Sequence, residues 1–218
     1  MKIIDWDQID TVLFDLDGTL IDLQLDVAFW KRLVPHAYAE KSGLDQRHSQ
    51  IHLHQLYTQI EHSMQWYDID HWAEVLQLPI RDMLRRHAAN TKVRYGVYPL
   101  LSFLQRNGKK LILLTDSHPF SLQLKLEQCQ LAPYFSHLIS SHQFQKPKMD
   151  SELWQRLYRD YPIDPQRTLL IDDMEKVLDC AKQSGLAYTL GVELPDSQAA
   201  AKVFTNHRSI RNFHQLLD

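Results

Sequence analysis

The sequence predicts an α/β protein: a Rossmann-like parallel sheet with helices on both faces, plus a small all-helical domain inserted after the first strand. Three observations support this prediction. Residues 12–14 form a short apolar run, typical of a strand buried on both faces, and the run stops at two aspartates. Residues 22–92 show helical periodicity almost throughout. Strand-like and helix-like segments then alternate to residue 192.

The first strand ends in two carboxylates, Asp15 and Asp17, followed by Gly18. In an open α/β sheet, ligands bind outside the carboxyl ends of the strands. Because one residue separates the two acids, their side chains should project from the same side of an extended backbone. Gly18 lets the chain turn at once. An Asp-Gly turn that closes a hairpin is the alternative interpretation.

The region from residue 22 to residue 92 contains one glycine and two prolines, and no strand-like segment interrupts it. Apolar residues spaced by three and four predict one face of a single helix; they are Leu53, Leu56, Tyr57, Ile60 and Met64. Further helices are expected over 26–41, 68–76 and 80–89. We therefore expect a helical domain at 22–92 and a core domain made of residues 1–21 and 93–218.

From residue 93 onward, strands and helices are expected to alternate. The strands are predicted at 111–114, 137–140, 168–171 and 188–192, with the last of these as the final strand. The helices are predicted at 99–107, 119–128 and 151–161, and between Asp173 and Gly185. This alternation favours parallel pairing with helices on both sides of the sheet.

Polar residues stand at the carboxyl ends of two later strands. Thr115 and Asp116 follow the second strand, where a hydroxyl beside free backbone N–H groups can hold a phosphate; Thr115 could equally cap the next helix. Asp172 and Asp173 follow the fourth strand. One helix cap needs only one aspartate, so the second carboxylate indicates a metal site.

Composition limits the classes of protein. The 218 residues, 44% apolar and 23% charged, suit a folded chain with one sizeable core and a smaller domain. A net charge of −3 offers no broad basic surface, so no nucleic-acid partner is expected. The only cysteines, Cys129 and Cys180, exclude a disulfide framework and a four-cysteine zinc site. No apolar run approaches the ~18 residues of a membrane span, and no signal-peptide core is visible, so we expect a cytoplasmic protein without a membrane partner.

Residues 15–20, Asp-Leu-Asp-Gly-Thr-Leu, resemble the signature of the haloacid dehalogenase (HAD) superfamily, mostly phosphatases that work through an aspartyl-phosphate. Thr115, a lysine before a helix and the acid pair 172–173 match the other motifs of the superfamily in the expected order. The resemblance implies that the helical insertion is a cap of the C1 type. The dehalogenases of this superfamily lack an acid at the position of Asp17, so a phosphatase is favoured.

Longer matches resemble the bacterial GMP/IMP nucleotidases of this superfamily. They lie at 30–35, 66–67, 113–115 with 117–119, 147–148 with Asp150 and Trp154, and 190–192 with 195–197. Asp116 departs from the asparagine that these enzymes generally carry. The resemblance implies a 5'-nucleotidase that hydrolyses purine nucleoside monophosphates. A phosphatase or mutase for a sugar phosphate, and a non-catalytic phosphate-binding regulator, are the alternatives. A monomer or homodimer is expected.

By the same resemblance, Asp15 would be the nucleophile and Asp17 the general acid and base. Thr115 and Lys148 would hold phosphate oxygens. The lysine is open to two interpretations, because Lys146-Pro147-Lys148 offers two candidates. Lys148 is preferred, since Leu and Trp stand five and six positions after it, where the superfamily has a buried pair.

The expected cofactor is Mg²⁺, which prefers hard oxygen ligands and takes one or two carboxylates. The resemblance implies that Asp15, the main-chain carbonyl of Asp17 and Asp173 would bind the ion directly. Asp172 would bind it directly or lie just behind the direct ligands.

Substrate choice should come from the helical insertion. Trp66 and Tyr67 could stack on a base, and Arg81 could donate to purine or phosphate acceptors. Asp116 would lie beside the phosphate. Tryptophans at helical spacing are more often core residues, and arginines four positions apart, such as Arg81 and Arg85, more often lie on a solvated helix face. His48 and His52 share a helical spacing of four but have no third zinc ligand placed with them.

Overall fold

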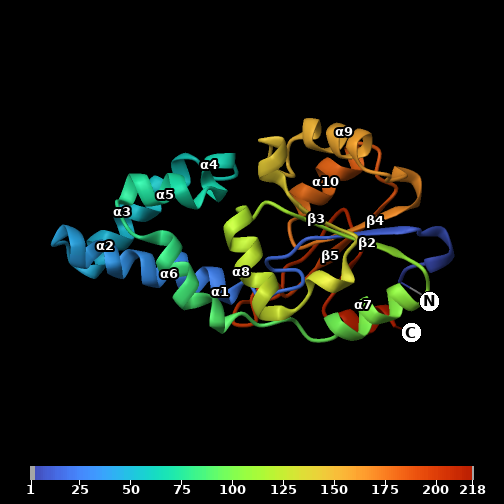
Figure 1. Ribbon diagram of the computed structural model, residues 1–218, viewed down its shortest axis with the longest axis horizontal. Helices are drawn as coiled ribbons and strands as arrows, with labels where there is room; N and C mark the ends of the chain where they lie inside the picture. The colour runs from blue at the N-terminus through green and yellow to red at the C-terminus, as the bar shows by residue number, and fades with distance from the viewer. Residues whose placement is uncertain (1–2, 218) are drawn as a thin grey trace.

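The computed structural model describes residues 3–217, and Figure 1 shows a sheet flanked by helices at one end and a lobe of helices at the other. Within these residues the sheet has six strands in the order β3-β2-β1-β4-β5-β6, and every neighbouring pair is parallel. The strands are β1 (Thr11–Phe14), β2 (Lys110–Thr115), β3 (His137–Ser140), β4 (Thr168–Asp172), β5 (Tyr188–Val192) and β6 (Ser209–Ile210). The predicted fold class is confirmed.

Helices cover both faces of the sheet. Val12 and Phe14 of β1 pack toward α7 (Val97–Arg106) and α8 (Pro119–Cys129). Leu13 points the other way, toward α9 (Ser151–Asp160) and α10 (Glu175–Gln183), because successive strand residues face opposite sides. Figure 1 accordingly shows α9 and α10 on one side of the sheet and α7 on the other. This double burial explains why β1 is apolar along its length.

The helical insertion (residues 22–92) contains α1 (Gln24–Ala28), a π-helical turn (Phe29–Leu33), α2 (Val34–Ser42), α3 (Gln46–Gln59), α4 (Met64–Tyr67), α5 (Ile69–Leu76) and α6 (Ile80–His87). These helices bury an apolar cluster of their own, to which Phe120 and Leu124 of α8 are added. The chain leaves and re-enters the core at one place, where the Asp22 N–H donates to the Lys92 carbonyl at 2.9 Å. The exact domain boundaries stay a prediction.

The expected apolar stripe from Leu53 to Met64 does not lie on one helix. α3 ends at Gln59, His62 adopts a left-handed conformation with φ of 68°, and the Ser63 hydroxyl caps α4 by accepting from the Trp66 N–H at 3.3 Å. No glycine or proline marks this break, so the helical spacing of the apolar residues predicted one continuous helix. The break turns residues 60–63 into a loop, of which Glu61 and His62 line the cavity described below.

Two further differences concern local backbone structure. The helix predicted at 26–41 runs from Gln24 to Ser42 with an internal π-helical turn just before Pro35, a residue that cannot donate a backbone hydrogen bond. The prediction that 188–192 is the final strand was wrong, because β6 pairs with β5. A two-residue strand is too short to leave a periodic pattern.

Across residues 3–217, every helix falls short of the length and apolar character that crossing a bilayer would require.

Candidate active site

The carboxyl ends of three adjacent strands bring the predicted acids together. Phe14 at the end of β1 pairs with Leu113 of β2 and Ile171 of β4, so the residues that follow these strands meet at one edge of the sheet. The Asp15 N–H donates to the Ile171 carbonyl at 3.0 Å, which fixes the start of the loop. Carboxylate oxygens of Asp15, Asp172 and Asp173 lie within 4.8 Å of one another, and all three residues are buried.

Lys148 lies between two of these acids. Its Nζ donates to an oxygen of Asp15 at 2.6 Å and to an oxygen of Asp172 at 2.6 Å. Burial raises the pKa of Asp15 to about 7 and that of Asp172 to about 6, against the opposing effect of Lys148. Burial also disfavours the charged ammonium, but the neighbouring carboxylates outweigh it and hold the pKa of Lys148 well above its ordinary value. Lys148 therefore stays charged and partly neutralises the acid cluster.

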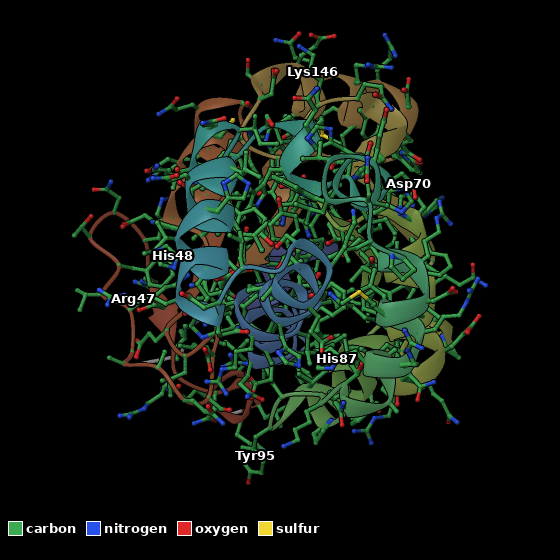
Figure 2. The ribbon with its side chains drawn as sticks, turned by 90° about the vertical axis from the view of Figure 1, so that its left-hand side faces the viewer. Arg47, His48, Asp70, His87, Tyr95 and Lys146 are labelled. Atoms are coloured by element: carbon green, nitrogen blue, oxygen red, sulfur yellow. The ribbon has the colours of Figure 1, made fainter. Side chains whose placement is uncertain are left out.

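Of the two candidate lysines, only Lys148 reaches this cluster. Lys146 pairs with Asp150 and Glu152 on the surface, and Figure 2 shows it at the outer rim of the molecule. Two buried contacts hold Lys148 in place: its N–H donates to Asp116 at 3.0 Å, and its carbonyl accepts from the Trp154 indole at 2.8 Å. The predicted buried position of Trp154 is confirmed.

Asp116 has a partner that sequence reasoning missed. One carboxylate oxygen of Asp116 accepts the hydrogen bond from the Lys148 backbone N–H. Asp116 also lines the cavity described below. Thr115 is buried at the end of β2, and its hydroxyl accepts from the Ser117 N–H at 3.1 Å. Thr115 and Asp116 thus lie where the sequence predicted, with Asp116 bonded to the loop that carries the lysine.

The adjacent acids Asp172 and Asp173 have different environments. Asp172 is fully engaged, since one oxygen accepts from Lys148 and the other from the Met174 N–H at 2.8 Å. Asp173 accepts from the more exposed Lys202 at 2.6 Å through one oxygen only. Burial raises the pKa of Asp173, in opposition to Lys202. Asp173 is therefore better able than Asp172 to offer an oxygen to a metal ion. Lys202 follows the last predicted strand and gave no signal in the sequence.

Asp17 turns away from this cluster toward a buried lysine. Its Oδ1 accepts from Lys125 Nζ at 2.6 Å, and the same ammonium donates to both oxygens of Asp26 at 2.9 and 2.8 Å. Sequence reasoning missed Lys125 and Asp26. A signal existed, because Lys125 falls on the apolar stripe of α8 with Leu122, Leu126 and Cys129, where an exposed lysine would not be expected.

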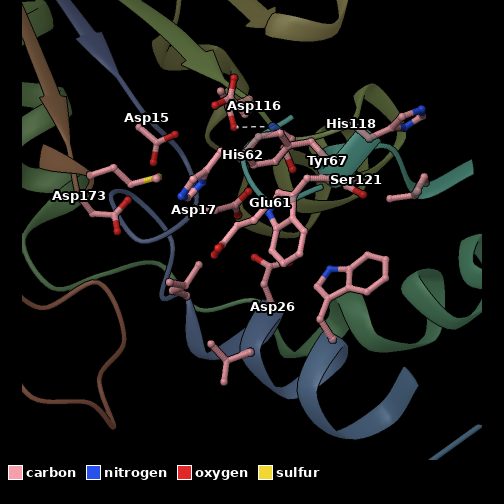
Figure 3. A pocket seen from close by; sticks show the side chains of 18 of the residues that line it. Asp15, Asp17, Asp26, Glu61, His62, Tyr67, Asp116, His118, Ser121 and Asp173 are labelled. Carbon is pink, nitrogen blue, oxygen red and sulfur yellow. Dashed lines mark hydrogen bonds between the residues drawn. The ribbon is translucent and has the colours of Figure 1, made fainter. Parts of the chain in front are cut away.

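A cavity of about 410 Å³ opens beside the cluster, within the size range of small-ligand sites. Asp15, Asp17 and Thr115 line it from the core, and Trp66 and Tyr67 line it from the helical insertion. Further lining residues from the insertion are Trp30, Lys31, Tyr57, Glu61, His62 and Trp72. Glu61 and His62 line the same cavity as Asp17 (Figure 3), so the loop at 60–63 brings polar groups to the site. Burial raises the pKa of Tyr67, which keeps its phenol protonated.

Arg81 is not brought to the cavity. Its guanidinium makes two hydrogen bonds to Asp70, at 2.7 and 2.6 Å, and lies over the Phe120 ring with 4.7 Å to the ring centroid. Asp70 lies at the edge of the molecule in Figure 2. His48, which the zinc alternative needed, is exposed and pairs with Asp45. The structure therefore gives Arg81 and His48 partners on the surface of the helical insertion.

The carboxylate cluster suits a divalent cation with a preference for oxygen. Three buried carboxylates lie close together, and burial raises the pKa of each of them. Carboxylate oxygens are the ligands that Mg²⁺ prefers. Gly18 allows this arrangement: its φ is +88°, and a Cβ added there would lie 2.9 Å from Cγ of Asp173. The donor set therefore fits Mg²⁺.

Buried carboxylates lie at the carboxyl edge of the parallel sheet, and a ligand-sized cavity lies beside them. This arrangement is typical of a Rossmann-like enzyme whose active site is built from aspartates. The model of the haloacid dehalogenase-like hydrolase family matches residues 9–185, and the chain belongs to this family. It is therefore a hydrolase.

Similar proteins agree with this assignment. The GMP/IMP nucleotidase YrfG of Escherichia coli is 39% identical over 214 residues, which cover 98% of this chain and 96% of that protein. The crystal structure of a HAD phosphatase from Thermococcus onnurineus superposes with a TM-score of 0.81 at 19% identity, covering 95% and 96% of the two chains. CbbY from Rhodobacter sphaeroides, solved in complex with phosphate, gives a TM-score of 0.62 at 18% identity, with 95% and 96% covered. The two structures support the shared fold.

Proposed function

We propose that this protein is a Mg²⁺-dependent 5'-nucleotidase that hydrolyses purine nucleoside monophosphates, GMP and IMP, through an aspartyl-phosphate on Asp15. The observation that carries the proposal is the cavity, which is lined by carboxylates and Lys148 from the core and by aromatic side chains from the helical insertion. The identity to a GMP/IMP nucleotidase over nearly the whole chain supports the same substrate class.

Asp15 acts as the nucleophile. One of its oxygens forms a bond to phosphorus while the bond from phosphorus to the ribose oxygen breaks. Lys148, which contacts Asp15 at 2.6 Å, and Thr115 hold the non-bridging phosphate oxygens. The carboxylate cluster and the Asp17 carbonyl would hold Mg²⁺, which when bound would supply positive charge that offsets the phosphate dianion.

Asp17 moves the proton in both halves of the reaction. It first gives a proton to the departing ribose oxygen, and the nucleoside leaves. Asp17 then takes a proton from a water that attacks the phosphorus, and the bond between phosphorus and Asp15 breaks to release inorganic phosphate. General acid–base catalysis of this kind contributes about 10²–10⁴-fold to a rate.

The helical insertion selects the base. Trp66 and Tyr67 offer aromatic faces for stacking, while Lys31 and Glu61 line the same cavity with a donor and an acceptor. A 6-oxopurine presents the complementary pair, a carbonyl oxygen and a ring N–H, whereas adenine does not. This chemistry favours GMP and IMP over AMP, because the polar edge of adenine would leave Lys31 and Glu61 without matching partners.

The test is phosphate release from a panel of GMP, IMP, AMP, pyrimidine monophosphates and sugar phosphates, each with Mg²⁺ and with EDTA. We expect release from GMP and IMP only in the presence of Mg²⁺. The Asp15→Asn variant should lose turnover while keeping its circular dichroism spectrum, and Asp10→Asn, which changes an exposed acid paired with Arg167, serves as its control.

The remaining outcomes separate the alternatives. Metal-dependent release from sugar phosphates alone would replace the nucleotidase with a sugar-phosphate phosphatase or mutase. Turnover retained by Asp15→Asn would contradict the covalent mechanism. No release from any substrate would favour a phosphate-binding regulator.

A further inference from the structure

Lys125 is a buried cation that the mechanism above does not use. It lies on α8 with only 5% of its side chain exposed, and its ammonium contacts Asp17 and Asp26 at hydrogen-bond distance. All three residues line the cavity beside Asp15. Because burying an ammonium is costly unless it is paired, a lysine at this position needs a reason.

The three residues come from three different parts of the fold. Asp17 belongs to the loop after β1, Lys125 to a core helix, and Asp26 to α1, the first helix of the helical insertion. Lys125 therefore joins the loop that carries the acid to both regions that enclose the cavity. Among the described residues, Lys125 is the side chain that donates a hydrogen bond to the Asp17 carboxylate.

We propose that Lys125 is a positioning residue, which holds the Asp17 carboxyl group toward the leaving-group oxygen while Asp26 fixes the ammonium from the helical insertion. The inference rests on the phosphatase chemistry proposed above. Proton transfer needs the acid within hydrogen-bond reach of the departing oxygen, and a displacement of about 1 Å can cost 10²-fold in rate. An Asp17 side chain without Lys125 loses this restraint.

The leaving group provides a readout that a purely structural role would not change. An alkyl phosphate such as a nucleoside monophosphate releases a strongly basic oxygen that needs a proton, whereas p-nitrophenyl phosphate releases a stable phenolate that does not. The ratio of kcat/KM for the two substrates therefore reports proton donation by Asp17. The value of kcat/KM includes only the steps up to departure of the alcohol or phenol. The later attack of water on the aspartyl-phosphate therefore does not affect it.

The variant to measure is Lys125→Met combined with Asp26→Asn, which removes the cation together with one of its acids and so avoids a second unpaired buried charge. We expect the ratio of kcat/KM for the alkyl ester over the aryl ester to fall by at least about tenfold. Asp17→Asn should lower the same ratio and sets the scale. Asp26→Asn alone, which keeps the contact between Lys125 and Asp17, should lower it less than the double variant.

A double variant whose two kcat/KM values fall by the same factor, or do not fall, would overturn the positioning role. The wild-type enzyme gives the separate test of the proposed function. If it hydrolyses a sugar phosphate and no nucleotide, the nucleotidase proposal fails, and the sugar phosphate becomes the alkyl ester for the Lys125 comparison. If it hydrolyses aryl phosphate and no alkyl ester, both proposals fail.

Discussion

Replacing Lys148 by methionine would remove the cation that separates two buried acids. Its Nζ lies 2.6 Å from Asp15 and from Asp172, and its side chain is 2% exposed. Breaking a buried ion pair by removing one partner costs about 3–5 kcal/mol, because the other charge stays buried. For a chain of this size each kcal/mol shifts Tm by about 2–4 °C. We therefore expect Tm to fall by roughly 6–20 °C at pH 8 in EDTA.

The pH dependence of this loss has a definite sign. Burial raises the pKa of Asp15 to about 7 in the folded protein, above its ordinary value near 3.9, so the folded state binds more protons and stability falls as the pH rises between these values. Without Lys148 the folded-state pKa of Asp15 rises further, and the window of falling stability extends to higher pH. The loss should therefore be smaller at pH 5.5 than at pH 8. Lys148 itself stays charged across this range, since its pKa is raised above the ordinary value.

Thermal unfolding followed by circular dichroism at pH 5.5 and pH 8, with EDTA and with Mg²⁺, measures these changes. Lys146→Met is the matched control, because Lys146 is a partly exposed lysine two positions away whose partners are surface acids, and it should change Tm little. Mg²⁺ should restore part of the stability lost in Lys148→Met. Equal losses in the two variants, or a larger loss at pH 5.5 than at pH 8, would refute the reasoning.

Three further predictions concern Gly18, the metal site and Arg81. Gly18→Ala should weaken Mg²⁺ binding measured by calorimetry, because the added Cβ would lie 2.9 Å from Asp173 Cγ. Gly108→Ala controls for backbone strain, since Gly108 also has a positive φ but an added Cβ would meet nothing within 4 Å. Equal Mg²⁺ binding by the two variants would contradict the argument from the Asp173 contact. Mg²⁺ binding at pH 6 should release about one proton per ion, and fewer at pH 8.5, because the pKa of Asp15 is about 7 before the ion binds. Calorimetry in two buffers of different ionisation enthalpy measures this release. No proton release at pH 6 would contradict the prediction. Arg81→Ala should leave KM unchanged, since Arg81 is paired with Asp70 outside the cavity; a large rise in KM would return Arg81 to the substrate site.

The parts of the fold that sequence reasoning predicted are those governed by local pattern. Strands buried on both faces must be apolar runs, and the strands at 137–140 and 188–192 have the predicted bounds. Polar residues that follow such runs must meet at one edge when the strands are parallel, so the amino-acid sequence alone was enough to group Asp15, Thr115 and Asp172.

The parts that could not be predicted depend on packing between distant segments. Lys125 and Asp17 are 108 positions apart, and no periodic signal connects a helix residue to one loop carboxylate rather than another. Arg81 finds Asp70 eleven positions away on a neighbouring helix, outside the spacing of three or four that links residues on one helix. His62 takes a left-handed conformation without being glycine, and tertiary contacts rather than local preference hold such a residue.

The charges around the cavity explain why several lysines and a metal ion can belong to the same site. Lys125, Lys148 and Lys202 contact five carboxylates, those of Asp15, Asp17, Asp26, Asp172 and Asp173. With all of these groups ionised, the three positive and five negative charges leave a net charge of −2, which one divalent cation would balance. Burial, with a smaller contribution from Asp172, raises the pKa of Asp15 to about 7, so proton uptake by Asp15 removes part of this negative charge below that pH. Binding of a divalent ion would therefore both ionise the proposed nucleophile and lower the negative charge that an incoming phosphate dianion would meet.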